Sequence, residues 1–166
     1  MAVTLHTSLG DLRAELFCSL APQSCRNFLA LAASGYYNGT TFHRNVADFM
    51  IQGGDPTSEG KGGLNYLGAY QADEIIPELK HDRRGILSFA NLGKPDTVGS
   101  QFFITYSPQP HLDGIYSVFG KLAGNFEALA KIEAVPVGRK SRPLEDIKIE
   151  RISIQFNPIA EADNPI

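Results

Sequence analysis

The sequence has 166 residues, with no tryptophan, two methionines and two cysteines. Cys18 and Cys25 are too far apart for a C-x-x-C redox pair, so we expect two free thiols that behave as small apolar residues. No segment approaches 18 consecutive apolar residues, so we expect no membrane-spanning helix. The N-terminus lacks a basic segment followed by an apolar one, so we expect no secretory signal and an intracellular protein.

Excess positive charge is also absent. There are 15 Lys and Arg against 18 Asp and Glu, and no run of basic residues stands out. This balance argues against a sequence-independent nucleic-acid or anionic-membrane surface, so neither partner is predicted. The four histidines are far apart, and no pair has the spacing of metal ligands, so no metal or cofactor is expected. Nothing in the composition requires an oligomer, and we expect a monomer.

Local patterns predict a β-hairpin and two helices. Residues 3–16 alternate apolar and polar on both sides of a turn cluster, which is typical of a hairpin. A helix is predicted to begin at Pro22, a residue suited to the first helical position, and to end at Gly35. A second helix is predicted after Asn125 as its N-cap. Its apolar face would carry Phe126, Leu129 and Ile132.

The other predicted elements are short strands. They are expected near residues 85–90, 101–104, 116–119 and 147–156. In the last of these the apolar alternation slips by one residue between 149 and 152, which predicts a bulge or a change of face. Many short strands with two helices favour a β-barrel or sandwich with the helices outside. We expect one domain over residues 1–156, followed by a loosely ordered tail over 157–166.

One glycine-rich loop comes close to a phosphate-binding motif. Residues 53–62 resemble such a loop, but Asp55 stands where the motif requires glycine, and neither Ser nor Thr follows Lys61. A carboxylate at that position would repel phosphate. No carboxylate pair is marked out for acid–base chemistry either, so nucleotide binding and hydrolysis are not expected.

Three segments carry a more specific pattern. Residues 42–55 begin with Phe-His-Arg and end with Gln-Gly-Gly-Asp, residues 87–104 contain Ala-Asn and Gly-Ser-Gln-Phe-Phe, and residues 112–120 contain Leu-Asp-Gly and Val-Phe-Gly. This order resembles the signatures of the cyclophilins, over almost the whole chain. The resemblance implies a mainly β fold, a closed eight-stranded antiparallel barrel capped by two α-helices. It also implies peptidyl-prolyl cis-trans isomerase activity on Xaa-Pro-containing proteins or peptides.

The resemblance assigns the catalytic role to Arg44. Rotation about an Xaa-Pro bond breaks no covalent bond, but it must overcome a barrier of roughly 18–20 kcal/mol that arises from amide resonance. A fixed cationic donor to the proline nitrogen favours the twisted state, in which that resonance is lost. The guanidinium of Arg44 would stay charged at any relevant pH and hold its donors in a rigid fork. Taken alone, an arginine at this position is most often an ordinary surface residue, and only the joint pattern assigns it the catalytic role.

The same resemblance implies the substrate-binding residues. The proline pocket would consist of Phe49, Met50, Phe103 and Leu112. Gln52 and Gln101 would orient the substrate carbonyl and Arg44, and the backbone of Ala90 and Asn91 would pair with the peptide like an added strand. Taken singly, Phe49, Met50 and Phe103 are more often ordinary core residues. His43 is expected to be structural or to touch the rear of the site.

Two rim positions differ from most cyclophilins. His111 stands where most have tryptophan, and Tyr116 where most have histidine. Tyr116 can still wall the pocket with an aromatic face, whereas His111 loses apolar area and a fixed donor, so we expect cyclosporin to bind weakly. Residues 91–99 are one residue longer than usual, and Leu92 replaces a small residue beside the pocket for residues that precede proline.

These departures resemble the peptidyl-prolyl isomerase-like 3 (cyclophilin J) subfamily. The resemblance implies a setting in pre-mRNA splicing complexes, with spliceosomal proteins as partners and a nuclear or cytoplasmic location. An alternative function is a proline-recognising scaffold of a ribonucleoprotein assembly with weak or incidental catalysis. The sequence does not identify the client proteins.

Overall fold

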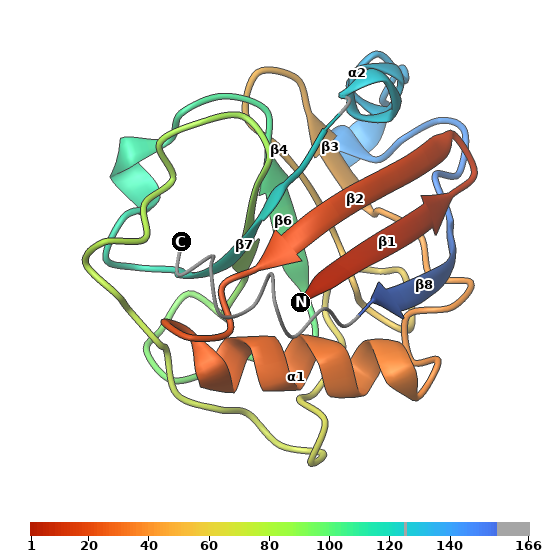
Figure 1. Ribbon diagram of the computed structural model, residues 1–166. Helices are drawn as coiled ribbons and strands as arrows, with labels where there is room; N and C mark the ends of the chain where they lie inside the picture. Colours follow the sequence, from red (N-terminus) through yellow and green to blue (C-terminus); the bar gives the residue numbers. More distant parts are fainter. Residues whose placement is uncertain (125, 156–166) are drawn as a thin grey trace.

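The computed structural model describes residues 1–124 and 126–155, which form one strongly curled antiparallel sheet with two helices (Figure 1). The sheet has eight strands in the order β3-β4-β6-β5-β7-β2-β1-β8. Their bounds are β1 Ala2–Thr7, β2 Gly10–Leu16, β3 Arg44–Val46, β4 Met50–Gly53, β5 Ile86–Phe89, β6 Phe102–Thr105, β7 Ser117–Leu122 and β8 Ile149–Gln155. The mainly β, two-helix architecture predicted from the sequence is therefore confirmed.

The two edge strands, β3 and β8, approach each other through the segments that precede them. Thr41 and Lys148 form an antiparallel bridge, and the Phe42 N–H donates to the Ile147 carbonyl oxygen at 2.9 Å. The curl of the sheet thus brings its edges together over a short stretch only.

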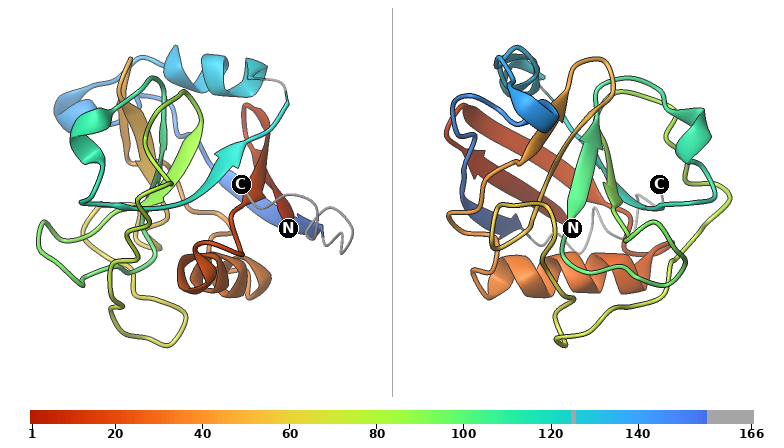
Figure 2. Two further views of the ribbon diagram at one scale, coloured as in Figure 1. Left: turned by 60° about the vertical axis from the view of Figure 1, so that its left-hand side comes forward. Right: turned by 180° about the vertical axis from the view of Figure 1, so that it is seen from behind.

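The helices cover opposite ends of the curled sheet in every view (Figure 2). Helix α1 spans Pro22–Ala33 and begins at the predicted proline. It ends with Gly35 in the left-handed region at φ 76°, where glycine carries no Cβ penalty, and the Tyr36 N–H returns to the Leu31 carbonyl. Helix α2 spans Glu127–Glu133, and the predicted cap Asn125 lies outside the described residues. Two short 3₁₀ turns, η1 (Pro110–Leu112) and η2 (Arg139–Ser141), complete the regular elements.

The predicted hairpin and bulge are both present. β1 and β2 pair from Ala2 opposite Glu15 to Thr7 opposite Gly10. The register between β1 and β8 shifts at His6 and Thr7, so that Glu150 is the extra residue. Ile147 and Ile149 are fully buried before this bulge, and Ile152 and Ile154 pack against the core after it.

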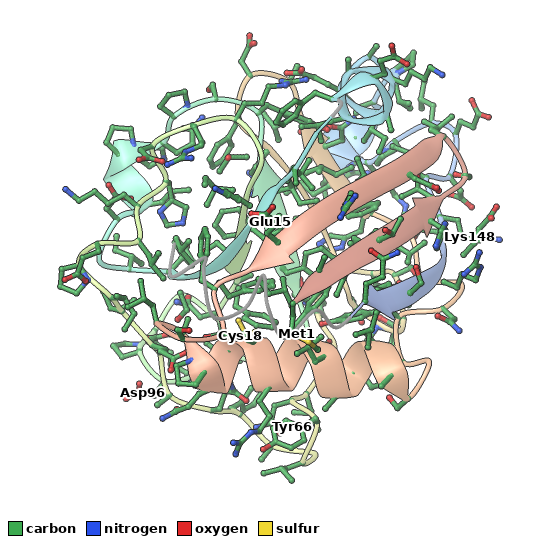
Figure 3. All side chains as sticks on the ribbon, in the orientation of Figure 1. Met1, Glu15, Cys18, Tyr66, Asp96 and Lys148 are labelled. Carbon is green, nitrogen blue, oxygen red and sulfur yellow. The ribbon has the colours of Figure 1, made fainter. Side chains whose placement is uncertain are left out.

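Both cysteines are free, and Cys18 lies between the N-terminus and α1 (Figure 3). Neither helix of the described ranges is long and apolar enough to cross a membrane. The predicted tail, residues 157–166, lies outside the described residues.

The apolar side chains form two separate clusters, and this separation positions the site. The larger cluster fills the inside of the sheet and includes Phe102. The smaller one lies on the other face and is built from Met50, Ala90, Phe103 and Leu112. Because successive strand residues point to opposite faces, β6 contributes Phe102 to the main core and Phe103 to the second cluster.

Candidate active site

A pocket of about 220 Å³ opens over the second cluster. It is lined by Arg44, Phe49, Met50, Gln52, Ala90, Asn91, Phe103, Leu112 and Tyr116. These residues come from separate parts of the chain, and together they are all of the predicted site residues except Gln101 and His111.

The floor and one wall of the pocket are apolar. Met50 and Phe103 are 2% and 3% exposed, and Leu112 closes the floor from η1. The half-buried Tyr116 ring meets Phe103 edge-on, with ring centroids 5.5 Å apart at 90°. A slot with this lining matches a proline ring, which has no N–H to satisfy.

The opposite wall is polar. Arg44 and Gln52 are cross-strand partners of β3 and β4, and the Arg44 guanidinium carbon lies 5.8 Å from the centroid of the Phe49 ring. The Gln52 Nε2 donates to Gln101 Oε1 at 2.9 Å, and Gln101 Nε2 donates to the Gly62 carbonyl at 2.9 Å. Gln101 therefore stands behind Gln52 and holds its amide in one orientation. Arg44 is exposed, with its charge at the mouth of an apolar slot.

The remaining predicted residues stand at the rim. His111 is exposed in η1, and its ring packs 5.8 Å from that of Phe49 without lining the pocket. The Ala90 N–H donates to the Gln101 carbonyl at 3.0 Å, so pairing of this segment with a peptide would use other backbone groups. The Asn91 side chain stabilises the turn that follows it, because its Oδ1 accepts a hydrogen bond from the Gly93 N–H at 2.9 Å.

His81 supports the pocket from behind, a role that the sequence reasoning missed. Its buried ring stacks on Phe103 at 5.7 Å and 14°. Nδ1 donates to Asp113 at 2.8 Å, and Nε2 accepts from the Ser88 hydroxyl at 3.0 Å. Burial lowers the pKa of His81 below its ordinary value and outweighs the opposing effect of Asp113, which favours the neutral ring at neutral pH. The only sequence signal was Asp113 within the Leu-Asp-Gly motif, and no local pattern links it to His81.

The loop that resembles a phosphate-binding motif holds its own anion. The fully buried Asp55 carboxylate accepts from the backbone N–H groups of residues 57 and 59–62. Burial alone would raise the pKa of Asp55, but these hydrogen bonds and that from the Thr57 hydroxyl hold it below its ordinary value of 3.8. The backbone N–H groups that would bind a phosphate are thus already paired with Asp55. Because the Gly62 N–H is one of them, the loop also holds the Gly62 carbonyl oxygen in place as the acceptor for Gln101.

This carboxylate predicts an acid-dependent stability. Because the folded-state pKa of Asp55 lies below that of the unfolded chain, its contribution is present above about pH 4 and lost as the pH falls through the folded-state pKa. We expect Asp55→Asn to be about 1–3 kcal/mol less stable at neutral pH and to lose less stability on acidification than wild type. Urea unfolding between pH 7 and pH 3 measures both. Parallel stability–pH curves for the two proteins would contradict this assignment.

Among residues 1–124 and 126–155, no three His, Cys, Asp or Glu side chains come together as metal ligands. The pocket offers one cation, two side-chain amides and an apolar slot. It can therefore hold a peptide around a proline and place a positive donor beside it, without a nucleophile.

Comparison with known proteins agrees with this chemistry. Residues 2–154 match the family model of the cyclophilin type peptidyl-prolyl cis-trans isomerase/CLD. A peptidyl-prolyl cis-trans isomerase of Arabidopsis thaliana is 56% identical over 160 residues, covering 96% of this chain and 99% of the relative. The human peptidyl-prolyl cis-trans isomerase-like 3 is 53% identical over 162 residues, covering 97% and 100%.

Solved structures show the same likeness. The crystal structure of a cyclophilin type peptidyl-prolyl cis-trans isomerase of Cryptosporidium parvum, in the presence of the dipeptide Ala-Pro, superimposes with a TM-score of 0.91 at 54% identity. The match covers 95% of this chain and 100% of that one. With motifs, fold and relatives in agreement over nearly its whole length, the chain belongs to the cyclophilin-type peptidyl-prolyl cis-trans isomerases and is an enzyme of that type.

Proposed function

We propose that the pocket binds the proline ring of an Xaa-Pro peptide and that Arg44 catalyses rotation of the bond preceding it. The observation that carries the proposal is the position of Arg44, an exposed cation at the mouth of an apolar slot that includes Phe103 and Met50. A protein that only bound proline would need the slot, but it would not need a cationic donor beside the amide.

The mechanism follows from what the twisted amide requires. As the bond rotates, the nitrogen lone pair leaves conjugation and becomes able to accept a hydrogen bond. A guanidinium N–H directed at this nitrogen stabilises the twisted state more than either planar isomer, and only such a difference accelerates the reaction. The slot fixes the ring while Gln52, held by Gln101, orients the rotating carbonyl. The Ala-Pro dipeptide present with the Cryptosporidium parvum relative supports a substrate of this class.

The proposal extends to a cellular setting. The rim with His111 and Tyr116 resembles the peptidyl-prolyl isomerase-like 3 subfamily, whose name the human relative carries, and from this resemblance we propose spliceosomal proteins as clients and a nuclear or cytoplasmic location. The alternative, a proline-recognising scaffold with incidental catalysis, places the same pocket in a ribonucleoprotein assembly. Exchange NMR on a short Xaa-Pro peptide separates the two, because an isomerase accelerates cis–trans exchange at substoichiometric concentration. Stoichiometric binding without accelerated exchange would support the scaffold. Co-purification of splicing components from nuclear extract tests the setting in either case.

The rim predicts a difference between substrate and inhibitor. The exposed His111 offers less apolar area than tryptophan, and its ring forms no hydrogen bond among the described residues that would fix its tautomer. We expect His111→Trp to bind cyclosporin more tightly by about 1–3 kcal/mol, or roughly 5- to 150-fold. Turnover of a small proline peptide should change much less, because His111 does not line the slot. Calorimetric titration with cyclosporin and a parallel peptide assay measure both. If inhibitor affinity does not rise, or rises no more than substrate efficiency does, then His111 does not limit binding.

A further inference from the structure

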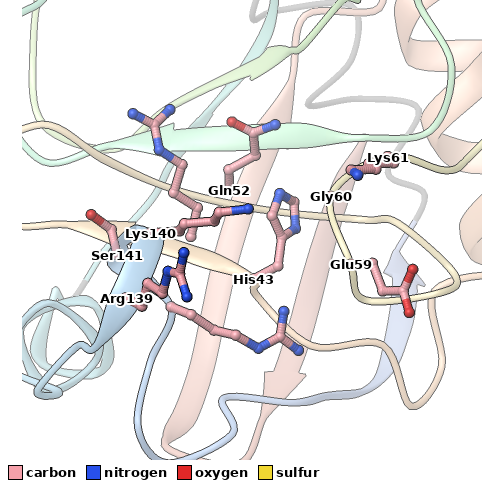
Figure 4. A pocket seen from close by; sticks show the side chains of 10 residues that line it. His43, Gln52, Glu59, Gly60, Lys61, Arg139, Lys140 and Ser141 are labelled. Carbon is pink, nitrogen blue, oxygen red and sulfur yellow. The ribbon is translucent and has the colours of Figure 1, made fainter.

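A second, larger groove adjoins the proline pocket. It has a volume of about 770 Å³ (Figure 4), and it adjoins the pocket at Arg44 and Gln52, which line both. Its other lining residues are His43, Glu59, Gly60, Lys61, Arg139, Lys140, Ser141 and Arg142.

The groove concentrates positive charge in an acidic chain. Five cationic side chains line it against the single carboxylate of Glu59, although the whole chain has a net charge of −3. Figure 4 shows Arg139 and Lys140 on one side of His43 and Lys61 on the other, with the Glu59 carboxylate turned away from His43. Within the described part of the chain, none of the five cations forms an ion pair. A fixed positive potential of this kind attracts anions.

The backbone holds this arrangement in place. Lys140 and Ser141 both have left-handed backbone angles, at φ 59° and 58°, which non-glycine residues adopt rarely and mainly where the surroundings enforce them. The Arg142 guanidinium donates to the Ser58 carbonyl at 2.8 Å and so ties this turn to the loop of Asp55. His43 lies against Gly60, where a Cβ would come within 2.8 Å of the ring. The buried His43 Nδ1 has no hydrogen-bond partner among the described residues. The lining of the groove therefore includes a polar atom whose hydrogen-bonding capacity is not satisfied by the fold.

From this geometry we infer that the groove binds an anionic side chain, a carboxylate or a phosphate, on the substrate peptide close to the isomerised proline. The inference rests on the proposed function and names its preferred substrate class: acidic or phosphorylated Xaa-Pro segments. A peptide whose proline ring fills the slot must pass Arg44 and Gln52 and can continue into the groove. Arginine pairs with phosphate through two parallel hydrogen bonds, and a phosphoserine carries more charge than a carboxylate at neutral pH.

A nucleic acid fits the groove less well. Proteins that bind single strands combine basic grooves with aromatic side chains on which bases stack, and no Phe, Tyr or Trp lines this groove. The acidic remainder of the chain also repels a long polyanion beyond the groove.

The test compares peptides that differ only in charge. A set of neutral peptides is prepared, each with a single serine within three residues of the proline on either its N-terminal or its C-terminal side. Each peptide is compared by exchange NMR with the versions in which glutamate or phosphoserine replaces that serine. We expect phosphoserine on one side of the proline to raise kcat/KM about 3- to 10-fold at low salt, with a smaller rise for glutamate, and both rises to shrink in high salt. The double variant Arg139→Gln/Lys140→Gln should lose most of this preference while its turnover of the neutral peptide stays within about twofold of wild type. Arg151→Gln, an exposed position on β8, is the matched control and should keep the preference.

Each result bears on one question. Turnover of the neutral peptide tests the proposed function, whereas the ratio of charged to neutral peptide tests the groove. Chemical-shift titration measures the affinities of the charged and neutral peptides, so the two can be compared even if the protein shows no turnover. Equal values for the neutral and phosphorylated peptides, a preference that survives in the double variant, or equal gains on both sides of the proline would overturn the inference. A short single-stranded RNA that binds more tightly than the phosphopeptide, and weakens in the double variant, would reassign the groove to nucleic acid.

Discussion

Arg44→Ala should reduce turnover of a proline peptide by roughly 10²- to 10³-fold, the loss expected when one preorganised donor is removed from a transition state. This loss corresponds to about 2.7–4 kcal/mol of barrier, a small part of the roughly 18–20 kcal/mol that the amide presents. Stability should change little, because the side chain is exposed and forms no ion pair among the described residues. Exchange NMR on the peptide and urea unfolding of both proteins measure the two effects.

The conservative variant sharpens this test. Arg44→Lys keeps the positive charge but loses the planar fork, so its turnover should lie between those of wild type and Arg44→Ala. Peptide affinity should change much less than turnover in both variants, since Arg44 lines only the mouth of the pocket and the apolar part that holds the proline ring is built from other side chains. If Arg44→Ala isomerises as fast as wild type, the cationic donor is not the source of catalysis. If all three proteins bind the peptide but none accelerates exchange, the scaffold interpretation holds.

Phe103→Ala should weaken peptide binding and also cost about 3–5 kcal/mol of stability. The ring is 3% exposed, forms the floor of the slot, and packs between the His81 ring and the edge of Tyr116. The sequence left two roles open for this residue, core and pocket, and its geometry serves both. Phe103→Leu retains most of the buried volume and keeps the protein folded for titration if the alanine variant unfolds.

The adjacent residue supplies a matched control. Phe102 lies on the same strand, is fully buried and belongs to the main core, so Phe102→Leu should lower stability without changing the affinity of the folded protein for peptide. Urea unfolding with peptide titration under folding conditions separates the two positions. If Phe103→Leu binds peptide as tightly as Phe102→Leu does, Phe103 belongs to the core alone.

Much of the fold could be predicted because its signals are local. Alternation over residues 3–16 encodes the β1–β2 hairpin, and Pro22 and Gly35 mark the ends of α1 through their own backbone preferences. The slip between residues 149 and 152 foretold the bulge of β8, because a change in alternation changes the face that a strand buries. The pocket residues followed from ordered motifs spread over the chain, and the fold brings most of them around one pocket.

Local sequence patterns thus predicted the two helices and six of the eight strands, and the ordered motifs indicated the family and most residues of the pocket, whereas β3 and β4 carried no strand pattern that was recognised. Only the tertiary structure decided which distant groups meet. His81 and Asp113 are 32 positions apart, and Arg44 is separated by a long stretch of chain from the turn at Arg139 and Lys140. A charge count averages over the molecule, so a chain with a net charge of −3 gave no sign of a basic groove. Electrostatic potential depends on the distance between charges in space, and those distances are set by the curl of the sheet and the turns that join its strands.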